Sequence, residues 1–517
     1  MKRISKLHVA IILLSCLFLS MVSLARALAA EFPLGRVAFD GHVHTWYSDE
    51  GPMTRGRSIK DVASNITAIL VDGAVFAVTD HSDVVDYGND LRSLFTRRDW
   101  LDRKKEIDEL RNKGFPVIIV PGMELTVGDG KGIDTHGHFL VYGLKDYWGE
   151  LQEARGLKAP FEKLTPDKLE DEKDARYAHQ PGYKLNEGDK VFWRKVYGGN
   201  PPRKDVRKAL EEVGAAGAFG YIAHPAGKDS WTPYAWSAIR SGGAPLAGRV
   251  VKGMEIFSGP RRQDSSGVIG EWDQTLDTLA GKFYRNILRQ GVNFFVTGGS
   301  DNHNGPGTIG GILGPNLGSS YTYLLFKDKK PTYNQDDIVD ALKKGHTVAT
   351  LGGPFVALTV EPVAGQEITV WEADEPHDTK HAGEPPAFPG DTVKAKPGQE
   401  LKITVWWEKA PAGSSIRVCS LGKGARKFQT VFYADLMGQP SGEKSFTWKT
   451  DPAGAFLIAR LEKSGSIAYT SPVFVDPPGV KRPAVDVALV IDCSGSMSWN
   501  DPQGLRKEAA KQFIDLM

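Results

Sequence analysis

Short apolar runs alternate with amphipathic stretches from Val37 to about Gly353. Seven runs have the length and residue types of buried strands: RVAFDGHVHT, AVFAVTDH, PVIIVPGMEL, GHFLVYGL, GYIAHPAG, VKGMEIFSG and VNFFVTGGSDNH. Segments with helical spacing lie between several of them, at Leu91–Lys113, Arg203–Val213 and Trp272–Gln290. This alternation predicts an α/β domain with a largely parallel sheet or barrel. We place the domain at residues 31–355, and a span of roughly 320 residues suits a (β/α) barrel with insertions.

Two segments of different composition interrupt or follow this pattern. Residues 150–200 are rich in charges and turn formers, which indicates a surface insertion such as a lid. After Gly353, short alternating runs such as PFVALTVEP and LKITVWWEKA are separated by Gly, Pro and Ser. This pattern of short alternating runs predicts an all-β sandwich, an accessory domain over residues 356–478.

The last stretch, residues 484–517, contains one strand-like run, a polar loop and one amphipathic helix. A single strand and a single helix cannot bury a core of their own. We therefore expect this stretch to be the start of a further domain whose remainder is missing from the chain.

The first 29 residues have the features of a secretory signal peptide. A positively charged head precedes a long apolar run, and the Ala27–Ala29 segment offers an Ala-x-Ala cleavage pattern. The prediction is a periplasmic or extracellular protein. Two alternatives stay open: the run approaches the ~20 residues of a retained membrane anchor, and LLSC around Cys16 weakly resembles a lipoprotein cleavage box.

Composition narrows the function classes. The 517 residues include 64 basic and 63 acidic side chains, which leaves a formal net charge of +1. Such a balance argues against an overall positive electrostatic field that would attract nucleic acid or a membrane surface. It leaves room only for a local basic patch. After cleavage only Cys419 and Cys493 would remain, too far apart in the sequence to indicate a disulfide framework or a zinc–thiolate site.

Histidines and acids gather on the strand-like segments of the first domain. His42 and His44 are two residues apart, so on a strand their side chains point to the same face. Of 12 histidines in the chain, six attach to these segments, and all but His138 lie at or just past the end of an apolar core. Because barrel active sites collect at the carboxyl ends of strands, we expect these side chains to meet. The candidate metal ligands are His42, His44, Asp49, His81, Glu124, His138, His224, Asp301 and His303.

Neutral imidazole and carboxylate ligands together suit Zn²⁺, Mn²⁺ or Fe²⁺. Eight or nine such groups are too many for one tetrahedral ion, so we expect two to three divalent ions, with Glu124 as the natural bridging carboxylate. Any one of these histidines alone would more often be a hydrogen-bonded structural residue. The prediction therefore depends on the joint pattern.

The ordered set DGHVHTWYSD, VTDH, GMEL, HFLVYGL, AHP and GSDNH resembles the PHP (polymerase and histidinol phosphatase) superfamily over roughly Val37 to Thr350. The segment ALKKGHTVATLGGPFVAL, followed by a β-sandwich, is more similar to a bacterial branch of undefined function than to histidinol phosphatase itself. The resemblance implies a distorted (β/α)7 TIM-like barrel. It also implies a metal centre, usually trinuclear, that hydrolyses phosphoesters.

Carried over residue by residue, the resemblance implies three sets of ligands. The first ion would be held by His42, His44, Glu124 and Asp301, the second by Glu124, His138 and His224, and the third by Asp49, His81 and His303. His136 competes with His138, but HFLVYGL aligns His138 with the family's strand.

The implied activity is hydrolysis of a phosphomonoester or phosphodiester, in a small molecule or a polymer, by hydroxide that the ions generate. Asp80 is a candidate to orient His81 or a neighbouring ligand. Arg261, next to Arg262, is a candidate for binding a substrate phosphate, with a solvated basic loop as the alternative. Glu255 would lie at the barrel rim, either supporting a ligand or in a structural role. The alternative functions are amidohydrolase-like hydrolysis of non-phosphate substrates and a non-catalytic surface binding module.

The segment VALVIDCSGSMSW resembles the opening of a Rossmann-like von Willebrand factor type A domain. In that family an Asp-x-Ser-x-Ser motif begins a metal site, and Asp492, Ser494 and Ser496 match it. Carboxylate and hydroxyl oxygens suit Mg²⁺, but the later ligands would lie on loops that the chain lacks. We therefore expect no ion here, and a protein or matrix partner for the complete domain. A chance Ser/Gly turn is the alternative.

Overall fold

The computed structural model describes residues 32–45, 47, 58–70, 73–81, 97–128, 136–145, 206–225, 239, 246–259, 279–302, 317–373, 384–422, 425, 428–463 and 466–476. The predicted signal peptide, the insertion at 150–200 and the segment 484–517 lie outside these residues. Within them, no helix is long and apolar enough to cross a membrane.

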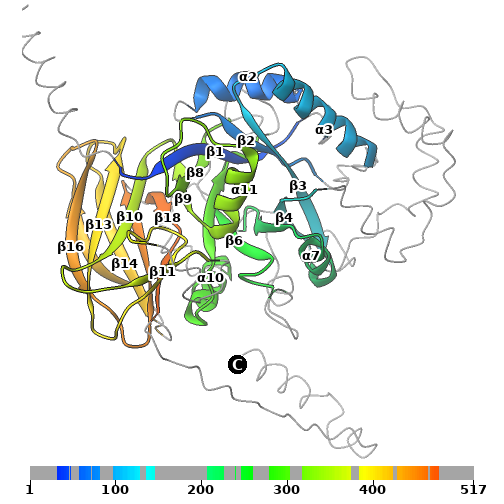
Figure 1. Cartoon of the computed structure of the whole chain (residues 1–517). Helices are drawn as coiled ribbons and strands as arrows, with labels where there is room; N and C mark the ends of the chain where they lie inside the picture. Colours follow the sequence, from blue (N-terminus) through cyan, green and yellow to red (C-terminus); the bar gives the residue numbers. More distant parts are fainter. Residues whose placement is uncertain are drawn as a thin grey trace, which may run out of the picture.

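The seven strand-like runs of the first domain all form strands. They are β1 (Gly35–Val43), β2 (Val75–Val78), β3 (Ile118–Gly128), β4 (His136–Tyr142), β5 (Phe219–Ile222), β6 (Val251–Ser258) and β7 (Phe295–Gly299). Two further strands follow, β8 (Ser320–Phe326) and β9 (Thr347–Leu351). The helices are α2 (Ile59–Ile69), α3 (Arg97–Asn112), α7 (Val206–Ala215), α10 (Leu279–Arg289) and α11 (Gln335–Lys344). Figure 1 shows α2 and α3 together on one side of this sheet.

The prediction of a (β/α)7 TIM-like barrel is wrong. In the part of the chain that the structure describes, 45% of residues lie in strands and 19% in helices, and there are only five helices. Sixteen of the strands form one curled mixed sheet, with 14 on a continuous path from β11 to β7. Pairing is parallel in β1–β2–β3 and in β5–β6–β7, but antiparallel in β3–β4–β5 and in β1–β8–β9.

The error has a physical reason. Apolar runs of this length look alike in parallel and antiparallel sheets, so the alternation alone does not give strand direction. Between Gly128, the last residue of β3, and His136, the first of β4, the connection is too short for a parallel crossover, which needs a dozen or more residues. That spacing was the available signal for a hairpin.

The sheet curls until the chain that leaves β7 returns to β1. Val43 and Asn302 form an isolated parallel bridge, and the backbone N–H of His44 donates to the carbonyl of Asn302 at 2.9 Å. Similar bonds tie neighbouring strand ends: the N–H of Thr79 donates to Val43, and that of Glu124 donates to Asp80. One end of the curled sheet is therefore a ring of strand ends held by backbone hydrogen bonds.

Helix α11 packs against side chains inside the curled sheet, away from the ring of strand ends. It begins with a capping box between Asn334 and Asp337 and ends at Gly345, which has a left-handed backbone with φ of 71°. The buried face of α11 packs into one core with Phe39, Tyr221 and Phe295 from the curled sheet. The Tyr221 hydroxyl also donates to the carbonyl of Leu342 in α11 at 2.6 Å. The helix thus closes the sheet's interior on the side away from the ring of strand ends.

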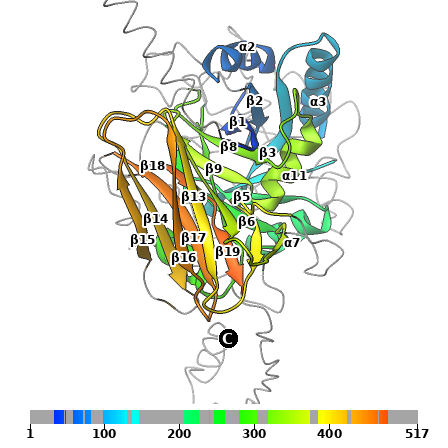
Figure 2. The same cartoon turned by 60° about the vertical axis from the view of Figure 1, so that its left-hand side comes forward.

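The C-terminal strands pack as two facing sheets (Figure 2). The smaller sheet contains β10 (Phe355–Pro362), β13 (Glu400–Glu408) and β16 (Gly442–Lys449). The others, which belong to the 16-stranded sheet, are β11 (Thr369–Trp371), β12 (Thr392–Lys394), β14 (Ser415–Gly422), β15 (Gln429–Asp435), β17 (Ala455–Glu462), β18 (Ser466–Thr470) and β19 (Val473–Asp476). Ile403 and Val405 of one sheet share a core with Leu457 and Leu461 of the other.

The 16-stranded sheet continues across the domain border that the sequence predicts between residues 355 and 356. Strand β18 pairs antiparallel with β9, so the C-terminal strands continue the N-terminal sheet. A second link joins Arg36 in β1 to Glu408 in β13, with two hydrogen bonds of 2.7 and 2.6 Å. The guanidinium also lies 4.4 Å above the ring of Phe355. The two regions are therefore joined by backbone pairing and by side chains.

We predict that Gly345→Ala destabilises the protein much more than Gly398→Ala. Both glycines have a left-handed backbone, with φ of 71° and 73°, so each alanine costs about 1–2 kcal/mol. A Cβ at Gly345 would lie 2.2 Å from the Phe295 ring, whereas a Cβ at Gly398 would meet nothing within 4 Å. The clash adds about 1–3 kcal/mol. Urea denaturation measures both losses, and equal losses would contradict the packing of α11 described above.

Candidate metal centre

The predicted ligands that the structure describes lie together at the ring of strand ends. His42 is in β1 with His44 just beyond it, His81 follows β2, and Glu124 and His138 are in β3 and β4; His224 follows β5 and Asp301 follows β7. Asp49 and His303, the other two predicted ligands, lie outside the described residues, as does Arg261.

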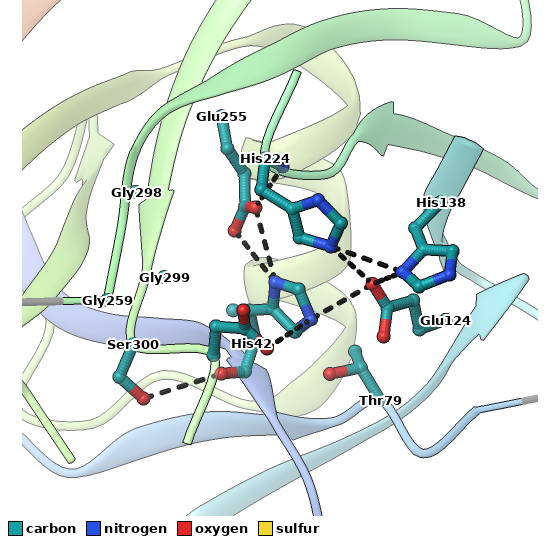
Figure 3. Close-up of polar contacts among 12 residues, drawn as sticks. His42, Thr79, Glu124, His138, His224, Glu255, Gly259, Gly298, Gly299 and Ser300 are labelled. Carbon is teal, nitrogen blue, oxygen red and sulfur yellow. Dashed lines mark hydrogen bonds and ion pairs between the residues drawn. The ribbon is translucent and has the colours of Figure 1, made fainter. Parts of the chain in front are cut away.

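Two groups of side chains could each hold a metal ion, and they share one carboxylate. The first group is His42, His44 and Glu124, and the second is His81, Glu124 and His138. All of these side chains are buried, and in each group the ligand atoms lie within 4.8 Å of one another. In Figure 3, dashed lines join Glu124 to the rings of His42, His138 and His224.

The distances around Glu124 are short. Its Oε2 lies 2.8 Å from Nδ1 of His81 and 3.3 Å from Nε2 of His44. Its Oε1 lies 2.8 Å from Nδ1 of His138 and 3.4 Å from Nε2 of His42. Each oxygen thus faces one histidine of each group, so both groups share the one carboxylate.

Asp301 and His224 extend the two groups. Asp301 Oδ1 lies 3.4 Å from Nε2 of both His42 and His44, next to the first group. His224 Nε2 lies 3.1 Å from Glu124 Oε1 and 3.2 Å from Nδ1 of His138, next to the second group. His81 lies with Glu124 and His138, whereas the family resemblance places it in a separate third set.

Electrostatic coupling in this pocket is strong. Burial alone would raise the pKa of Glu124, but the nearby His138, His81 and His42 hold it well below its ordinary value. Burial would lower the pKa of His42, but the carboxylates of Glu255, Asp301 and Glu124 raise it well above the ordinary value. The Glu124 carboxylate therefore requires positive charge around it, from imidazolium groups or from bound cations.

The residues fit a metal ion. Nε2 of His42 is buried and makes no hydrogen bond to any residue that the structure describes. Its neighbouring oxygens, on Glu124 and Asp301, are both 3.4 Å away. A buried polar atom without a hydrogen bond costs about 1–3 kcal/mol, a cost that a cation at this point would remove. Imidazole nitrogen and carboxylate oxygen are ligands that divalent transition metals accept.

Asp80 lies behind the ligands. Its carboxylate accepts hydrogen bonds from the backbone N–H of Thr45 at 2.6 Å and from the Thr45 hydroxyl at 3.0 Å. Arg103, a buried residue of α3, donates to Asp80 at 3.2 Å and to the carbonyl of Gly122 at 2.6 Å. Asp80 thus fixes the chain next to His44, while Arg103 joins the end of β2 to the middle of β3.

Sequence reasoning missed Asp40, a second buried carboxylate that holds the ring of strand ends. It accepts hydrogen bonds from the N–H of Ser300 at 2.9 Å and of Gly318 at 3.2 Å, so it ties β1 to the segments after β7 and before β8. Burial raises the pKa of the Asp40 carboxyl to about 6. The signal available in the sequence was an acid two residues before His42, on the same strand face.

The backbone is strained at two predicted ligands. His224 has φ of 25° and Asp301 has φ of 51°, values that residues with a side chain rarely adopt. Such strain costs of order 1–3 kcal/mol and persists where surrounding structure imposes it, commonly at functional sites. Each residue lies two positions after a strand, β5 or β7, in a turn that brings its side chain to the other predicted ligands.

Comparison of the chain with protein-family models and with curated proteins finds no match among either. The metal-binding interpretation therefore depends on the geometry described above.

We predict that Asp80→Ala lowers the free energy of unfolding by about 3–5 kcal/mol, because it leaves the charge of Arg103 buried without its carboxylate partner. Adding Arg103→Met should restore part of the loss. The control is Asp108→Ala, which breaks the half-exposed Asp108–Arg111 pair on the same helix and should cost less than about 1 kcal/mol. Chemical denaturation of the four proteins measures this. Similar losses for Asp80→Ala and Asp108→Ala would contradict the buried network.

Proposed function

We propose that this protein is a metal-dependent phosphoesterase of the PHP type. The observation that carries the proposal is Glu124, one buried carboxylate shared by two groups of histidines. The order of motifs along the chain, which resembles that superfamily, supports the same conclusion. We further propose that two or three divalent ions, Zn²⁺, Mn²⁺ or Fe²⁺, bind here, with Asp301 completing the first group and His224 the second.

Bound divalent ions would supply Lewis-acid chemistry: they lower the pKa of water toward neutrality and offset negative charge on phosphoryl oxygens. The protein's own residues hold the ions and shape access to them. His42, His44 and Glu124 have side chains at most 1% exposed, so they form the floor of the site. The Asp301 side chain is 26% exposed, and substrate would therefore approach from the side of Asp301.

The metal content of variants tests whether Glu124 contributes to both ion sites. Elemental analysis of the purified protein should find bound transition metal. His44→Ala should lower the content of one group and His138→Ala that of the other, whereas Glu124→Gln should lower both. His346→Ala is the matched control: His346 is also a buried histidine paired with a carboxylate, Asp391 at 3.1 Å, but it lies outside both groups. Wild-type metal content in Glu124→Gln would contradict the bridging role.

Substrate class is tested with a panel of a phosphomonoester, a phosphodiester and an amide, each assayed with Mn²⁺ and with Zn²⁺. We expect hydrolysis of at least one phosphate ester. Glu124→Gln should reduce kcat/KM by more than the about 10–100-fold that follows loss of a residue behind a metal ligand. Hydrolysis of the amide alone would replace the proposal with an amidohydrolase-like function. No turnover with ions fully bound would favour a binding module.

A further inference from the structure

Glu255, in β6, is a buried carboxylate that contacts two of the proposed ligands. Both of its oxygens lie 3.2 Å from Nδ1 of His42. Its Oε2 also accepts a hydrogen bond from the backbone N–H of His224 at 3.0 Å. Figure 3 shows Glu255 on the far side of the His42 ring from Glu124. One side chain thus touches ligands that come from β1 and from the end of β5.

The contact with His42 decides which ring nitrogen faces the metal groups. A carboxylate only accepts hydrogen bonds, so Nδ1 of a neutral His42 must carry the proton that it donates to Glu255. The lone pair is then on Nε2, the atom that lies 3.4 Å from both Glu124 and Asp301. Glu255 therefore favours the tautomer that can ligate an ion on this side.

The contact with His224 acts on the backbone. His224 has φ of 25°, and the bond from its N–H to Glu255 helps to hold this strained conformation. Gly299, at the end of β7, provides the space: a Cβ there would lie 2.6 Å from Glu255 Oε1 and 2.5 Å from the Cβ of His42. A glycine at this point lets β7 approach, so Glu255 and His42 keep their contact.

We propose that Glu255 is a positioning residue that fixes the tautomer of His42 and the backbone of His224, and so links the first and second ion sites. This inference rests on the proposed metal binding, not on the nature of the substrate. It predicts that Glu255 controls metal affinity without ligating an ion itself.

The chain offers a matched control outside the site. Asp391 is also a buried carboxylate that contacts a histidine ring nitrogen, Nε2 of His346 at 3.1 Å, and accepts from a backbone N–H, that of Phe388 at 3.0 Å. Burial raises the pKa of Asp391, as expected for a carboxyl away from water. Asp391→Asn thus reports the structural cost of losing a buried carboxylate of the same type.

The test compares wild type, Glu255→Gln and Asp391→Asn in titrations with Co²⁺, whose visible spectrum reports its ligands. In Glu255→Gln the amide can donate to Nδ1 and so favour the other His42 tautomer. We expect its Co²⁺ affinity to fall by about 10–100-fold and its Co²⁺ spectrum to change. Asp391→Asn should keep the wild-type affinity and spectrum. Thermal unfolding checks that each variant is folded.

Wild-type affinity and spectrum in Glu255→Gln would overturn the inference and leave the proposed function intact. A wild-type protein that binds no Co²⁺ would overturn both. Should Glu255→Gln not be recovered folded, ¹⁵N-histidine NMR of the Zn²⁺-loaded wild type decides, with His42→Ala used only to assign the signals. Protonation of His42 at Nδ1 supports the positioning role, and protonation at Nε2 overturns it.

Discussion

The candidate site depends on one buried negative charge. Glu124 is fully buried, and a carboxylate in such a place is unstable unless cations or several hydrogen-bond donors surround it. The histidines of β1, β2, β4 and β5 supply that environment, since all have a ring nitrogen within 3.4 Å of its oxygens. The strands that carry these residues must therefore bring them to the same place. Asp40, Asp80 and Arg103 hold the ends there through bonds to backbone N–H and carbonyl groups.

Much of the site could be predicted from the sequence, because the residue types that ligate metals recur at matching positions on the predicted strands. His42 and His44 share a strand face, and His81, His224 and Asp301 lie just past strand ends, as apolar runs bounded by polar residues indicated. Residues that act through the backbone were harder to find. Asp40 looked like part of a strand, and for Glu255 the sequence left ligand support and a structural role open, until its carboxylate was seen against Nδ1 of His42.

Strand direction and sheet continuity could not be read from the same pattern. The runs that became β1 to β7 were recognised, but hydrophobicity does not distinguish a hairpin such as β3–β4 from a crossover. The pairing of β18 with β9 joins residues more than a hundred positions apart, and no local signal marks it. A change in the hydrophobic pattern after Gly353 indicated a border between domains, yet the hydrogen bonds of the sheet continue across it.

That continuity bears on how the molecule could be divided. A fragment ending near residue 355 would retain the histidines but leave β9 as an open sheet edge, with the groups that bond to β18 facing water or another chain. It would also lose Glu408, the partner of Arg36 on β1, the strand that carries His42. The C-terminal strands therefore support the half that carries the candidate metal centre, and a minimal fragment that keeps this centre intact must include them.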